Sequence, residues 1–498
     1  MKLKDVIFHD YPQLMNQLLK FPIEWSECDI SGVSSNSCFI QPGWMFVAIK
    51  GNKADGHHFI SEAFKHGAVA IVISSAHSLQ DFSKISMGVP ILIVENTRIF
   101  LSLIAARLYG KYPDKILAVT GTSGKTSVAS FVRQICQYAG LSSAQIGEVG
   151  MISHQLKDES RMTTPDPVSL AQTLAHFSSQ GITHVSIEAS SHGLDQYRLD
   201  GIKIAAGSFT HLGRDHIDYH KTIQAYFNAK MRLFEELLPK GSPAVIFADD
   251  IWSKKVMNRA QKAGCNALSV GYDGQFIRIK KLAPEKGKQH VSLSIEGENW
   301  DVFFPLQGEF QFHNALVAAG MCIATGIDIP TVMSSLEKLE AIPGRLEFIG
   351  CNSKGGKIYV DYAHTPDSLT ILLQTLRSMT LGRIIMVFGC GGDRDRGKRK
   401  IMGLISLQLA DVSIVTDDNP RSEDPEIIRA DIIDGSPRFI EEGNRQKAIL
   451  LAISMLEKED ILVVAGKGYE TVKIVDKGKT RISIDCDIIR ELLLESSL

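Results

Sequence analysis

The chain has 498 residues, of which 44% are hydrophobic and 22% charged, and its formal net charge is −2. A chain of this length exceeds a single hydrophobic core, so two to four domains are expected. The nearly neutral balance argues against a protein that binds nucleic acid or an anionic membrane surface through bulk charge.

The segments that would mark secretion or membrane insertion are not found in the sequence. No apolar run approaches the roughly 18 residues that a transmembrane helix needs. Asp5, His9 and Asp10 lie where a signal peptide would have its apolar stretch. The eight cysteines are scattered without a C-x-x-C pair, which indicates neither a zinc site nor a disulfide framework. These features predict a protein of the reducing cytoplasm.

The N-terminal part of the chain predicts a small α/β domain. Helix-like pieces such as 58–66 alternate with short runs of aliphatic and β-branched residues, which are typical of strands. These runs are MFVAI at 45–49, AVAIVIS at 68–74 and PILIVE at 90–95. A helix pattern at 99–109 leads into the next part of the chain.

The most informative segment is KILAVTGTSGKTSV at 115–128, which predicts a strand, a glycine loop and the start of a helix. Backbone N–H groups, an ammonium and hydroxyls then converge on one point, as in loops that bind nucleotide phosphates and Mg²⁺. Val119 occupies the first glycine position of the usual G-x-x-x-x-G-K-[ST] pattern. The alternative is an ordinary strand–helix turn in which the glycines serve only geometry.

The central section alternates strands, at 183–190 and 204–213, with helices, at 168–179, 222–238 and 313–325. Such alternation after a phosphate loop predicts a mostly parallel sheet with ligands at the carboxyl ends of its strands. Glu188 and the segment GRDHIDYH, with Asp215, His216, Asp218 and His220, offer candidate ligands for Mg²⁺. Taken singly, each of these residues is more often structural.

A third α/β unit, doubly wound by its pattern, follows the break at Ile342-Pro343-Gly344, which we interpret as a hinge. Its strands are predicted at 357–363, 383–389, 412–418 and 460–466, and its helices at 367–378, 398–410 and 445–457. Polar or glycine residues end six strands of the two sheets and predict a cleft lined from both sides. DRDRGKRK at 393–400 could be a nucleic-acid patch, but acidic and glycine residues interrupt it.

Many ordered motifs of the chain resemble those of the Mur ligases, and among them the members that add the third amino acid of the peptidoglycan stem peptide. The motifs are TGTSGKTS at 120–127, TTPDP at 163–167, SIEASSHGLDQYR at 186–198, FTHLGRDHIDYH at 209–220, YFNAKMRLF at 226–234, GRLE at 344–347, DYAHTPDS at 361–368, GGDRDRGKR at 391–399, DDNPRSEDP at 417–425 and AGKGYE at 465–470. Ser123 and His211 replace an asparagine of the family pattern, Ala189 a valine and Cys38 an arginine.

The resemblance implies three α/β domains. A central P-loop ATPase-type domain with a parallel sheet (96–342) is flanked by a small N-terminal α/β domain that binds the UDP-MurNAc moiety (1–95). A C-terminal Rossmann-like domain (343–498) binds the incoming amino acid. The implied partners are small molecules, without nucleic acid or membrane insertion, and the implied state is a monomer.

The implied reaction adds meso-diaminopimelate to UDP-N-acetylmuramoyl-L-alanyl-D-glutamate, with ATP, Mg²⁺ and an acyl-phosphate intermediate. Three alternatives remain: the same ligase with L-lysine, a ligase like folylpolyglutamate synthase, and an ATP-binding scaffold without chemistry. Arg421 favours diaminopimelate, because a guanidinium pairs with its second carboxylate, which lysine lacks. With lysine bound, the Arg421 guanidinium would be desolvated and unpaired, which would cost on the order of 1–3 kcal/mol or more in binding free energy.

The resemblance also implies roles for individual residues. The implied catalytic residues are Lys125, Glu188, His216 and Lys230, and the implied Mg²⁺ ligands are Thr126, Glu188, His216 and a carbamylated Lys230. The implied ATP contacts are Gly121, Thr122, Ser123, Gly124, Lys125, Thr126, Ser127, Asn314, Arg345 and Asp361. The implied UDP-MurNAc-dipeptide contacts are Ser37, Thr163, Thr164, Ser190, Gln196 and Arg198. The implied diaminopimelate contacts are Arg394, Asp418, Asn419, Pro420, Arg421, Gly466 and Glu470. Without the matched motif, Lys230 would be interpreted as a lysine on a helix surface.

Overall fold

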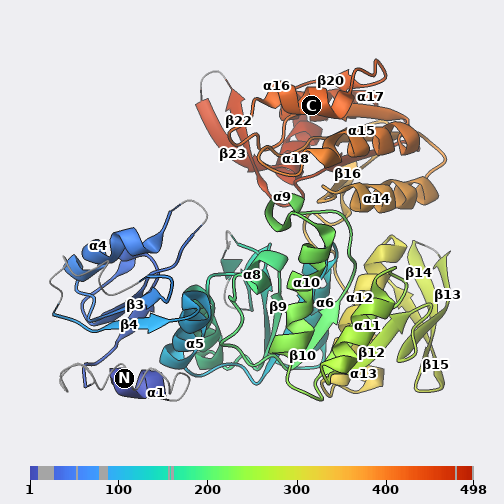
Figure 1. The fold of residues 1–498 in the computed structure, drawn as a ribbon. Helices are drawn as coiled ribbons and strands as arrows, with labels where there is room; N and C mark the ends of the chain where they lie inside the picture. Colours follow the sequence, from blue (N-terminus) through green and yellow to red (C-terminus); the bar gives the residue numbers. More distant parts are fainter. Residues whose placement is uncertain are drawn as a thin grey trace.

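The computed structural model describes residues 1–8, 27–51, 54–77, 88–154, 157–158, 162–285, 287–476 and 479–495. His9 and Asp10 of the predicted N-terminal pattern lie outside these residues. Three successive α/β domains follow one another along the chain (Figure 1), which confirms the predicted fold class. The C-terminal domain, orange to red in Figure 1, lies across the carboxyl-end side of the central domain. Among the described helices, none has the length and apolar character needed to span a bilayer.

The N-terminal domain is built on a four-stranded parallel sheet in the order β1-β2-β3-β4. Buried β-branched and aliphatic side chains form its core, and the Asn96 side chain caps α5. Helix α5 packs both on this sheet and against α7 of the central domain. The elements are α1 (Leu3–Phe8), β1 (Gly32–Ser34), β2 (Trp44–Val47), α4 (Ile60–Lys65), β3 (Ala70–Ser74), β4 (Ile91–Val94) and α5 (Thr97–Tyr109).

The central sheet has eleven strands in the order β15-β14-β13-β12-β11-β10-β5-β9-β6-β7-β8. It is parallel from β13 to β6, as predicted, but antiparallel strands extend both edges. The prediction of a mostly parallel sheet is confirmed, and the antiparallel edge strands are an addition that it did not include. The strands are β5 (Lys115–Thr120), β6 (Ser143–Gly147), β7 (Gly150–Ile152), β8 (Lys157–Asp158), β9 (His184–Glu188), β10 (Ala206–Phe209), β11 (Pro243–Phe247), β12 (Asn266–Gly271), β13 (Ile277–Glu285), β14 (Lys288–Ile295) and β15 (Glu298–Phe304).

Helices cover both faces of this sheet, and a separate apolar core fills each side. The helix predicted at 222–238 is a single α-helix only to Arg232, and a π-helical turn at Leu233–Leu237 continues it. The helices are α6 (Lys125–Tyr138), α7 (Pro167–Ser179), α8 (Ser191–Asp195), α9 (Ile217–His220), α10 (Ile223–Arg232), α11 (Ser253–Lys262), α12 (Glu309–Ala324) and α13 (Ile329–Leu336).

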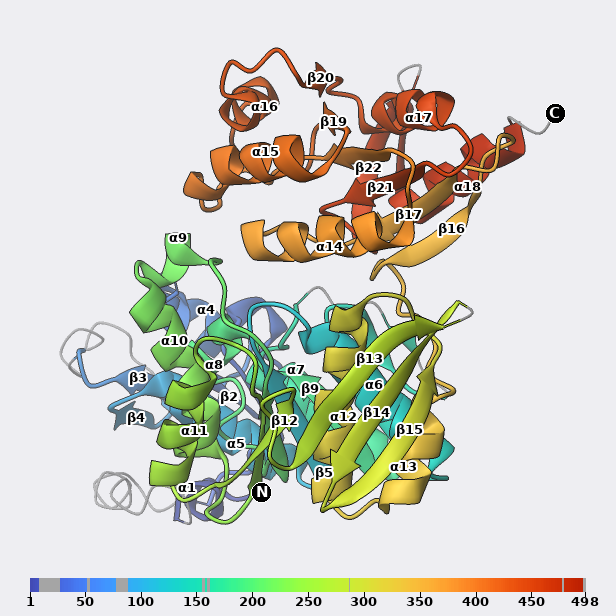
Figure 2. The ribbon, with the colours of Figure 1, turned by 90° about the vertical axis from the view of Figure 1, so that its right-hand side faces the viewer.

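The C-terminal sheet has the order β16-β17-β21-β18-β19-β20 and is parallel except for β16. Helix α14 lies on the side of this domain that faces the central domain (Figure 2). The elements of the C-terminal domain are β16 (Glu347–Cys351), β17 (Lys357–Asp361), α14 (Pro366–Met379), β18 (Ile384–Phe388), α15 (Gly397–Leu409), β19 (Val412–Val415), α16 (Pro425–Ile433), β20 (Ile440–Glu441), α17 (Arg445–Met455), β21 (Ile461–Ala465), β22 (Thr471–Asp476), β23 (Lys479–Ile484) and α18 (Asp485–Glu495).

Candidate active site

A cavity of ≈ 700 Å³ opens between the central and C-terminal domains, where the parallel strands of both sheets end. Loops after β5, β10 and β19 contribute to its wall, as do residues of α10 and α12. Such crevices at the carboxyl ends of parallel strands are where α/β folds bind ligands. The cleft predicted from six polar strand ends is therefore present.

The predicted phosphate loop joins β5 to α6, and residues Thr122 to Ser127 line the cavity. The Lys125 ammonium donates hydrogen bonds to the carbonyls of Gly121 (3.1 Å) and Thr122 (3.0 Å), across the loop. Gly124 has φ +87°, and a Cβ at this position would lie 2.3 Å from Asn314 Oδ1. A loop without a side chain at this point, followed by the positive end of a helix, fits a nucleotide phosphate.

Gly124→Ala is expected to weaken ATP binding at least about tenfold, because both the backbone conformation and Asn314 oppose a Cβ. Gly140→Ala is the matched control. Gly140 follows the same helix with φ +75°, but a Cβ there would meet no atom within 4 Å. Calorimetric titration with ATP should separate the two variants. Equal ATP affinities in the two variants would contradict the assignment of the loop.

Glu188, at the end of β9, has a buried carboxylate with an unused oxygen. Its side chain is 1% exposed, and Oε1 accepts a hydrogen bond from the Glu148 N–H (2.9 Å). Oε2 has no hydrogen-bond partner among the described residues. Burial, together with the charge of Glu148, raises the pKa of Glu188 to about 7. A carboxylate disfavoured as an isolated anion is a fitting ligand for a divalent cation.

His216 and Thr126 supply further donor atoms. Burial lowers the pKa of His216 to about 3, so the ring is neutral, and its Nδ1 has no partner among the described residues. Thr126 Oγ1 accepts a hydrogen bond from Arg345 Nη2 of the C-terminal domain (2.9 Å). An orphaned carboxylate oxygen, an orphaned ring nitrogen and a hydroxyl at the phosphate loop fit the predicted Mg²⁺ site.

Lys230 is buried rather than on a helix surface. It is 1% exposed, and its ammonium nitrogen lies 2.7 Å from the Gly121 carbonyl and 4.4 Å from the centre of the Tyr226 ring. Burial and the nearby Lys125 charge lower the pKa of Lys230 far below its ordinary value. The neutral amine that this environment favours is the form that can react with CO₂.

Side chains predicted to bind the nucleotide-peptide gather on one wall. Thr164 Oγ1 donates to the Glu188 carbonyl (2.7 Å) and contacts Ser190 Oγ (2.9 Å). Arg198 donates to the Thr164 carbonyl and to Gln196 Oε1. Thr163 Oγ1 lies 3.3 Å from Glu148 Oε2.

A second cavity of ≈ 460 Å³ lies between the N-terminal and central domains. Gln196 and Arg198 line it, and Arg198 lines the larger cavity as well. Ser37 lines neither cavity, because its buried hydroxyl donates to Glu62 (2.6 Å). Ser35 and Arg98, which the sequence did not single out, line the second cavity instead.

The predicted acceptor residues surround the C-terminal side of the large cavity. Arg421, in the loop after β19, has φ +51° and donates to the Gly392 carbonyl (2.7 Å). Lys467 forms an ion pair with Asp418 (3.1 Å), which lines the cavity with Asn419, Gly466 and Glu470. Pro420 lies in the same loop but is not among the cavity-lining residues. The Arg394 guanidinium lines the cavity 3.9 Å from Asp218 of the central domain.

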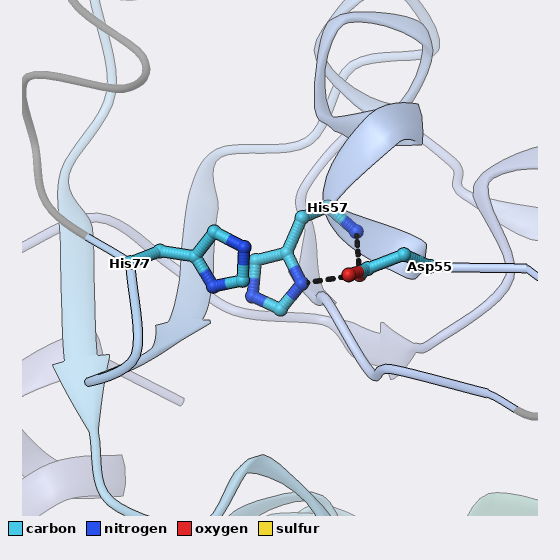
Figure 3. Close-up of side chains that lie close together, drawn as sticks. All are labelled: Asp55, His57 and His77. Atoms are coloured by element: carbon cyan, nitrogen blue, oxygen red, sulfur yellow. Dashed lines mark hydrogen bonds and ion pairs between the residues drawn. The ribbon is translucent and has the colours of Figure 1, made fainter.

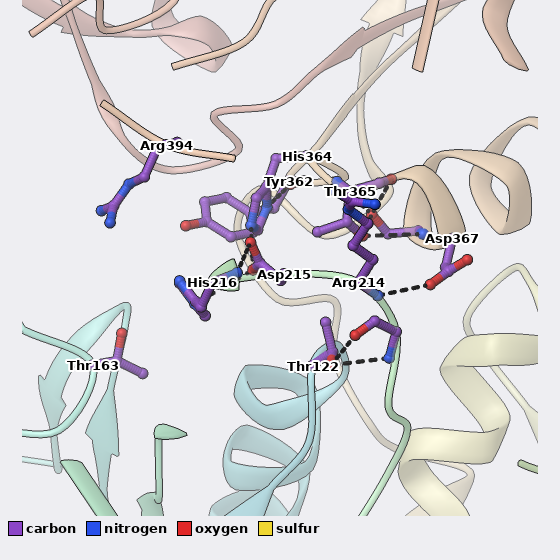
Figure 4. A network of polar contacts seen from close by, with 12 residues as sticks. Thr122, Thr163, Arg214, Asp215, His216, Tyr362, His364, Thr365, Asp367 and Arg394 are labelled. Atoms are coloured by element: carbon purple, nitrogen blue, oxygen red, sulfur yellow. Dashed lines mark hydrogen bonds and ion pairs between the residues drawn. The ribbon is translucent and has the colours of Figure 1, made fainter. Parts of the chain in front are cut away.

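Polar contacts join the central and C-terminal domains around the cavity (Figure 4). Arg214 pairs with Asp395 through two contacts of 2.7 and 3.1 Å. Asp215 lies 3.4 Å from both His364 and His216. Burial alone would raise the pKa of the Asp215 carboxyl, but its hydrogen bond with His364 and the nearby charge of Lys398 hold this pKa well below its usual range. These contacts position His216 beside the C-terminal domain.

His211, which replaces a family asparagine, is a charged bridge between domains. Its Nδ1 lies 2.7 Å from Asp250 of the central domain, and its Nε2 lies 3.9 Å from Asp367 of α14. Burial alone would lower the pKa of His211, but the two carboxylates raise it to about 9. Because the folded-state pKa exceeds the unfolded value of about 6.5, the stabilisation is full below that value and is lost as pH rises through 9.

We therefore expect the melting temperature of the wild type to fall more steeply between pH 7 and pH 10 than that of His211→Asn. At pH 7 the variant should melt a few degrees lower, because Asp250 loses its buried partner. Thermal melting of both proteins across this pH range tests the expectation. Parallel curves would rule out a protonated His211.

The basic run at 393–400 is not an exposed nucleic-acid patch. Arg399 is 1% exposed and pairs with Glu423 and Asp431. Arg396 also pairs with Glu423, and Lys400 pairs with Asp434. Arg396, Arg399 and Lys400 are thus paired with carboxylates of the C-terminal domain.

Asp55, His57 and His77 form a second titratable cluster, in the N-terminal domain (Figure 3). The two rings are stacked, with centroids 3.9 Å apart and planes at 15°. His57 Nδ1 bonds Asp55 (2.6 Å), and His57 Nε2 accepts the Ser74 N–H (3.2 Å). One ion cannot lie in the planes of two stacked rings, so this geometry fits a packed Asp–His pair rather than a metal centre.

The chain matches family models along most of its length. They are described as "Mur ligase family, catalytic domain" at residues 29–109, "Mur ligase middle domain" at 119–322 and "Mur ligase, glutamate ligase domain" at 344–468.

Individual proteins are also similar. The UDP-N-acetylmuramoyl-L-alanyl-D-glutamate--2,6-diaminopimelate ligase of Brucella melitensis is 50% identical over 475 residues, or 95% of each chain. A solved structure of a ligase with that name superposes with a TM-score of 0.69 at 30% identity, covering 100% of this chain and 99% of the other. A folylpolyglutamate synthase of Mycobacterium tuberculosis has a TM-score of 0.62 at 20% identity, covers 74% of this chain and 92% of its own, and shares the fold alone.

Proposed function

The chain belongs to the Mur ligase family, and on that premise we propose that it joins meso-2,6-diaminopimelate to UDP-N-acetylmuramoyl-L-alanyl-D-glutamate with hydrolysis of ATP. The observation that carries the proposal is one cavity bordered by the phosphate loop, by the metal-ligand candidates Thr126, His216 and Lys230, and by the acceptor loop that carries Arg421. A peptide-precursor ligase of this kind acts in the cytoplasm, and we propose a monomer.

The reaction explains the chemistry of the cavity. A carboxylate is a poor electrophile because its leaving group would be oxide, and phosphorylation by ATP converts it to an acyl phosphate. The amine of the acceptor then attacks, and phosphate leaves. The protein must neutralise phosphate charge, align two anions and exclude water.

The chain's own residues divide this work. Lys125 and the loop amides would hold the β- and γ-phosphates, and Asn314, Arg345 and Asp361 would contact the rest of ATP. Thr126, Glu188 and His216 would hold Mg²⁺, with a carbamylated Lys230 supporting the site. Bound there, Mg²⁺ would neutralise charge on the phosphate and on the substrate carboxylate.

The nucleotide-peptide would extend from the smaller cavity into the larger one past Arg198, Thr164 and Ser190. Its carboxylate would then lie beside the phosphate loop. Arg198 offers a two-pronged donor to a carboxylate or diphosphate. Ser37 remains a weaker candidate contact, because its hydroxyl is engaged by Glu62.

Diaminopimelate is favoured over L-lysine as the acceptor because Arg421 presents a guanidinium to the cavity. Arg394, Asp418, Asn419, Gly466 and Glu470 would complete the contacts. A folylpolyglutamate-synthase-like activity is less favoured, because the similarity to such enzymes is restricted to the fold.

ADP release tests the proposal when the nucleotide-dipeptide is supplied with diaminopimelate, with L-lysine or with no amino acid. Turnover with diaminopimelate alone is expected. Turnover with lysine would agree with the proposed mechanism but would contradict the assignment of diaminopimelate as the acceptor. ATP binding without turnover in every mixture would favour the scaffold alternative.

Small-angle scattering tests the hinge at Ile342-Pro343-Gly344, around which the domains should close on their ligands. Compaction upon addition of ATP and nucleotide-dipeptide is expected, and an unchanged radius of gyration would argue against closure.

A further inference from the structure

The phenol of Tyr362, just after β17, lies between two carboxylates from different domains. Its Oη is 3.0 Å from Glu148 Oε1 of the central domain and 2.9 Å from Glu470 Oε1 of the C-terminal domain. All three residues line the large cavity. In Figure 4 the Tyr362 oxygen points into the space bordered by His216 and Arg394.

This arrangement lacks one hydrogen-bond donor. A phenol carries one O–H, so it can donate to only one of two carboxylates. The other contact, at hydrogen-bond distance, then brings lone pairs of two oxygens together without a proton between them. The Tyr362 phenol oxygen and the two carboxylate oxygens can all accept hydrogen bonds, and only one hydrogen lies among them. A ligand with several N–H groups would fit this site.

The neighbouring cations do not meet this demand. Among the described residues, neither Glu148 nor Glu470 has a lysine, arginine or histidine within ion-pair distance. Arg345 lies over the face of the Tyr362 ring (4.2 Å), but its Nη2 donates to Thr126. Lys467 is paired with Asp418. The two carboxylates around the Tyr362 phenol therefore face the cavity without an ion-pair partner in the described part of the chain.

The position of Glu148 identifies the group to be bound. Its backbone N–H donates to Glu188, and its side chain contacts Thr163 on the nucleotide-peptide wall. Glu148 thus lies where the proposed metal site, the donor substrate and the acceptor loop meet. The amino group that attacks the activated carboxylate must reach this junction.

We propose that Glu148 and Tyr362, with Glu470 as the opposite wall, bind the reacting ammonium group of the incoming amino acid. The inference rests on the proposed ligase function and extends it by two residues that no family motif assigned to the acceptor. An ammonium supplies three N–H donors and one positive charge, which satisfies all three oxygens. Because the oxygens come from two domains, acceptor binding also holds the domains together.

Glu148→Gln provides a sharp test because it preserves shape. The glutamine amide can donate to Tyr362, so the contact between the domains is kept while the negative charge is removed. The KM for diaminopimelate is expected to rise at least about tenfold, as for loss of a charged hydrogen bond. The KM values for ATP and nucleotide-dipeptide, and the Mg²⁺ requirement, should change less than about twofold, and the melting temperature should not fall.

Two further variants sharpen the result. Tyr362→Phe should raise the acceptor KM in the same direction, because it removes an acceptor of the ammonium. Glu298→Gln, on the exposed edge strand β15, is a matched control outside the cavity and should leave all constants unchanged. Calorimetric titration of diaminopimelate into enzyme loaded with ADP and nucleotide-dipeptide measures the same loss without turnover.

The outcomes separate this inference from the function on which it rests. An unchanged acceptor KM in Glu148→Gln, with a wild type that uses diaminopimelate, would overturn the inference alone. A raised Mg²⁺ requirement with an unchanged acceptor KM would assign Glu148 to the metal site instead. A wild type that turns over no acceptor would overturn both.

Discussion

Lys230→Ala is expected to abolish amide formation, with a fall in kcat of at least about 10²–10³-fold, as for loss of a preorganised electrostatic group. The residue is buried between the phosphate loop and Tyr226, so no neighbouring side chain takes its place when it is removed. A carbamate on Lys230 would place a negative charge beside the metal-ligand candidates, whereas the unmodified neutral amine would place none there.

The measurement has two parts. ADP release by Lys230→Ala should recover partly when small carboxylates such as formate are added, because they can occupy the vacated space as anions. Wild-type activity should also fall in CO₂-free buffer and return with bicarbonate. Lys262→Ala, at the exposed end of α11, is the control for loss of a lysine. Full activity of folded Lys230→Ala would refute the carbamate.

Arg421→Ala is expected to lower kcat/KM for diaminopimelate by about 10²–10⁴-fold, because a site built to pair with a polar group depends on that pairing. Among the described residues, the guanidinium donates through Nη1 alone, to the carbonyls of Gly392 (2.7 Å) and Asn419 (3.5 Å), which leaves Nε and Nη2 for a carboxylate. The activity with L-lysine should change far less, so the preference between the two acceptors should shrink.

The ratio of kcat/KM for the two acceptors is the quantity to measure. Arg421→Lys keeps the positive charge but loses the planar fork, so its ratio should lie between those of the wild type and the alanine variant. If the ratio in Arg421→Ala equals that of the wild type, another residue selects the acceptor.

The phosphate loop could be predicted because its signal is local. Strand, glycine turn and helix start lie within 115–128, and their conformation follows from neighbouring residues. The same holds for Glu188, whose strand ends beside that loop. The edge strands β14 and β15 were missed, although VSLSI and NWDVFF flank a short turn and alternate in the manner of a hairpin.

Glu148 and Tyr362 could not have been found in this way. They are 214 positions apart and meet only because the C-terminal domain packs over the central one. Glu148 lies in none of the family motifs, and the motif DYAHTPDS at 361–368, which contains Tyr362, implied a role for Asp361 alone. Ser37 is the reverse case, since a motif drew attention to it while the folded chain directs its hydroxyl to Glu62. Distance along the chain, rather than residue type, limited the prediction of the site.

The shared position of Arg198 between the two cavities has a consequence for substrate choice. A ligand that occupies both cavities must pass the Arg198 guanidinium, and its two ends then bind to different domains. The protein then selects its substrate by length, because only a molecule with the right separation between its nucleotide and its carboxylate can occupy both cavities. Precursors one residue shorter or longer would bind through their nucleotide, but their carboxylate would not lie beside the phosphate loop.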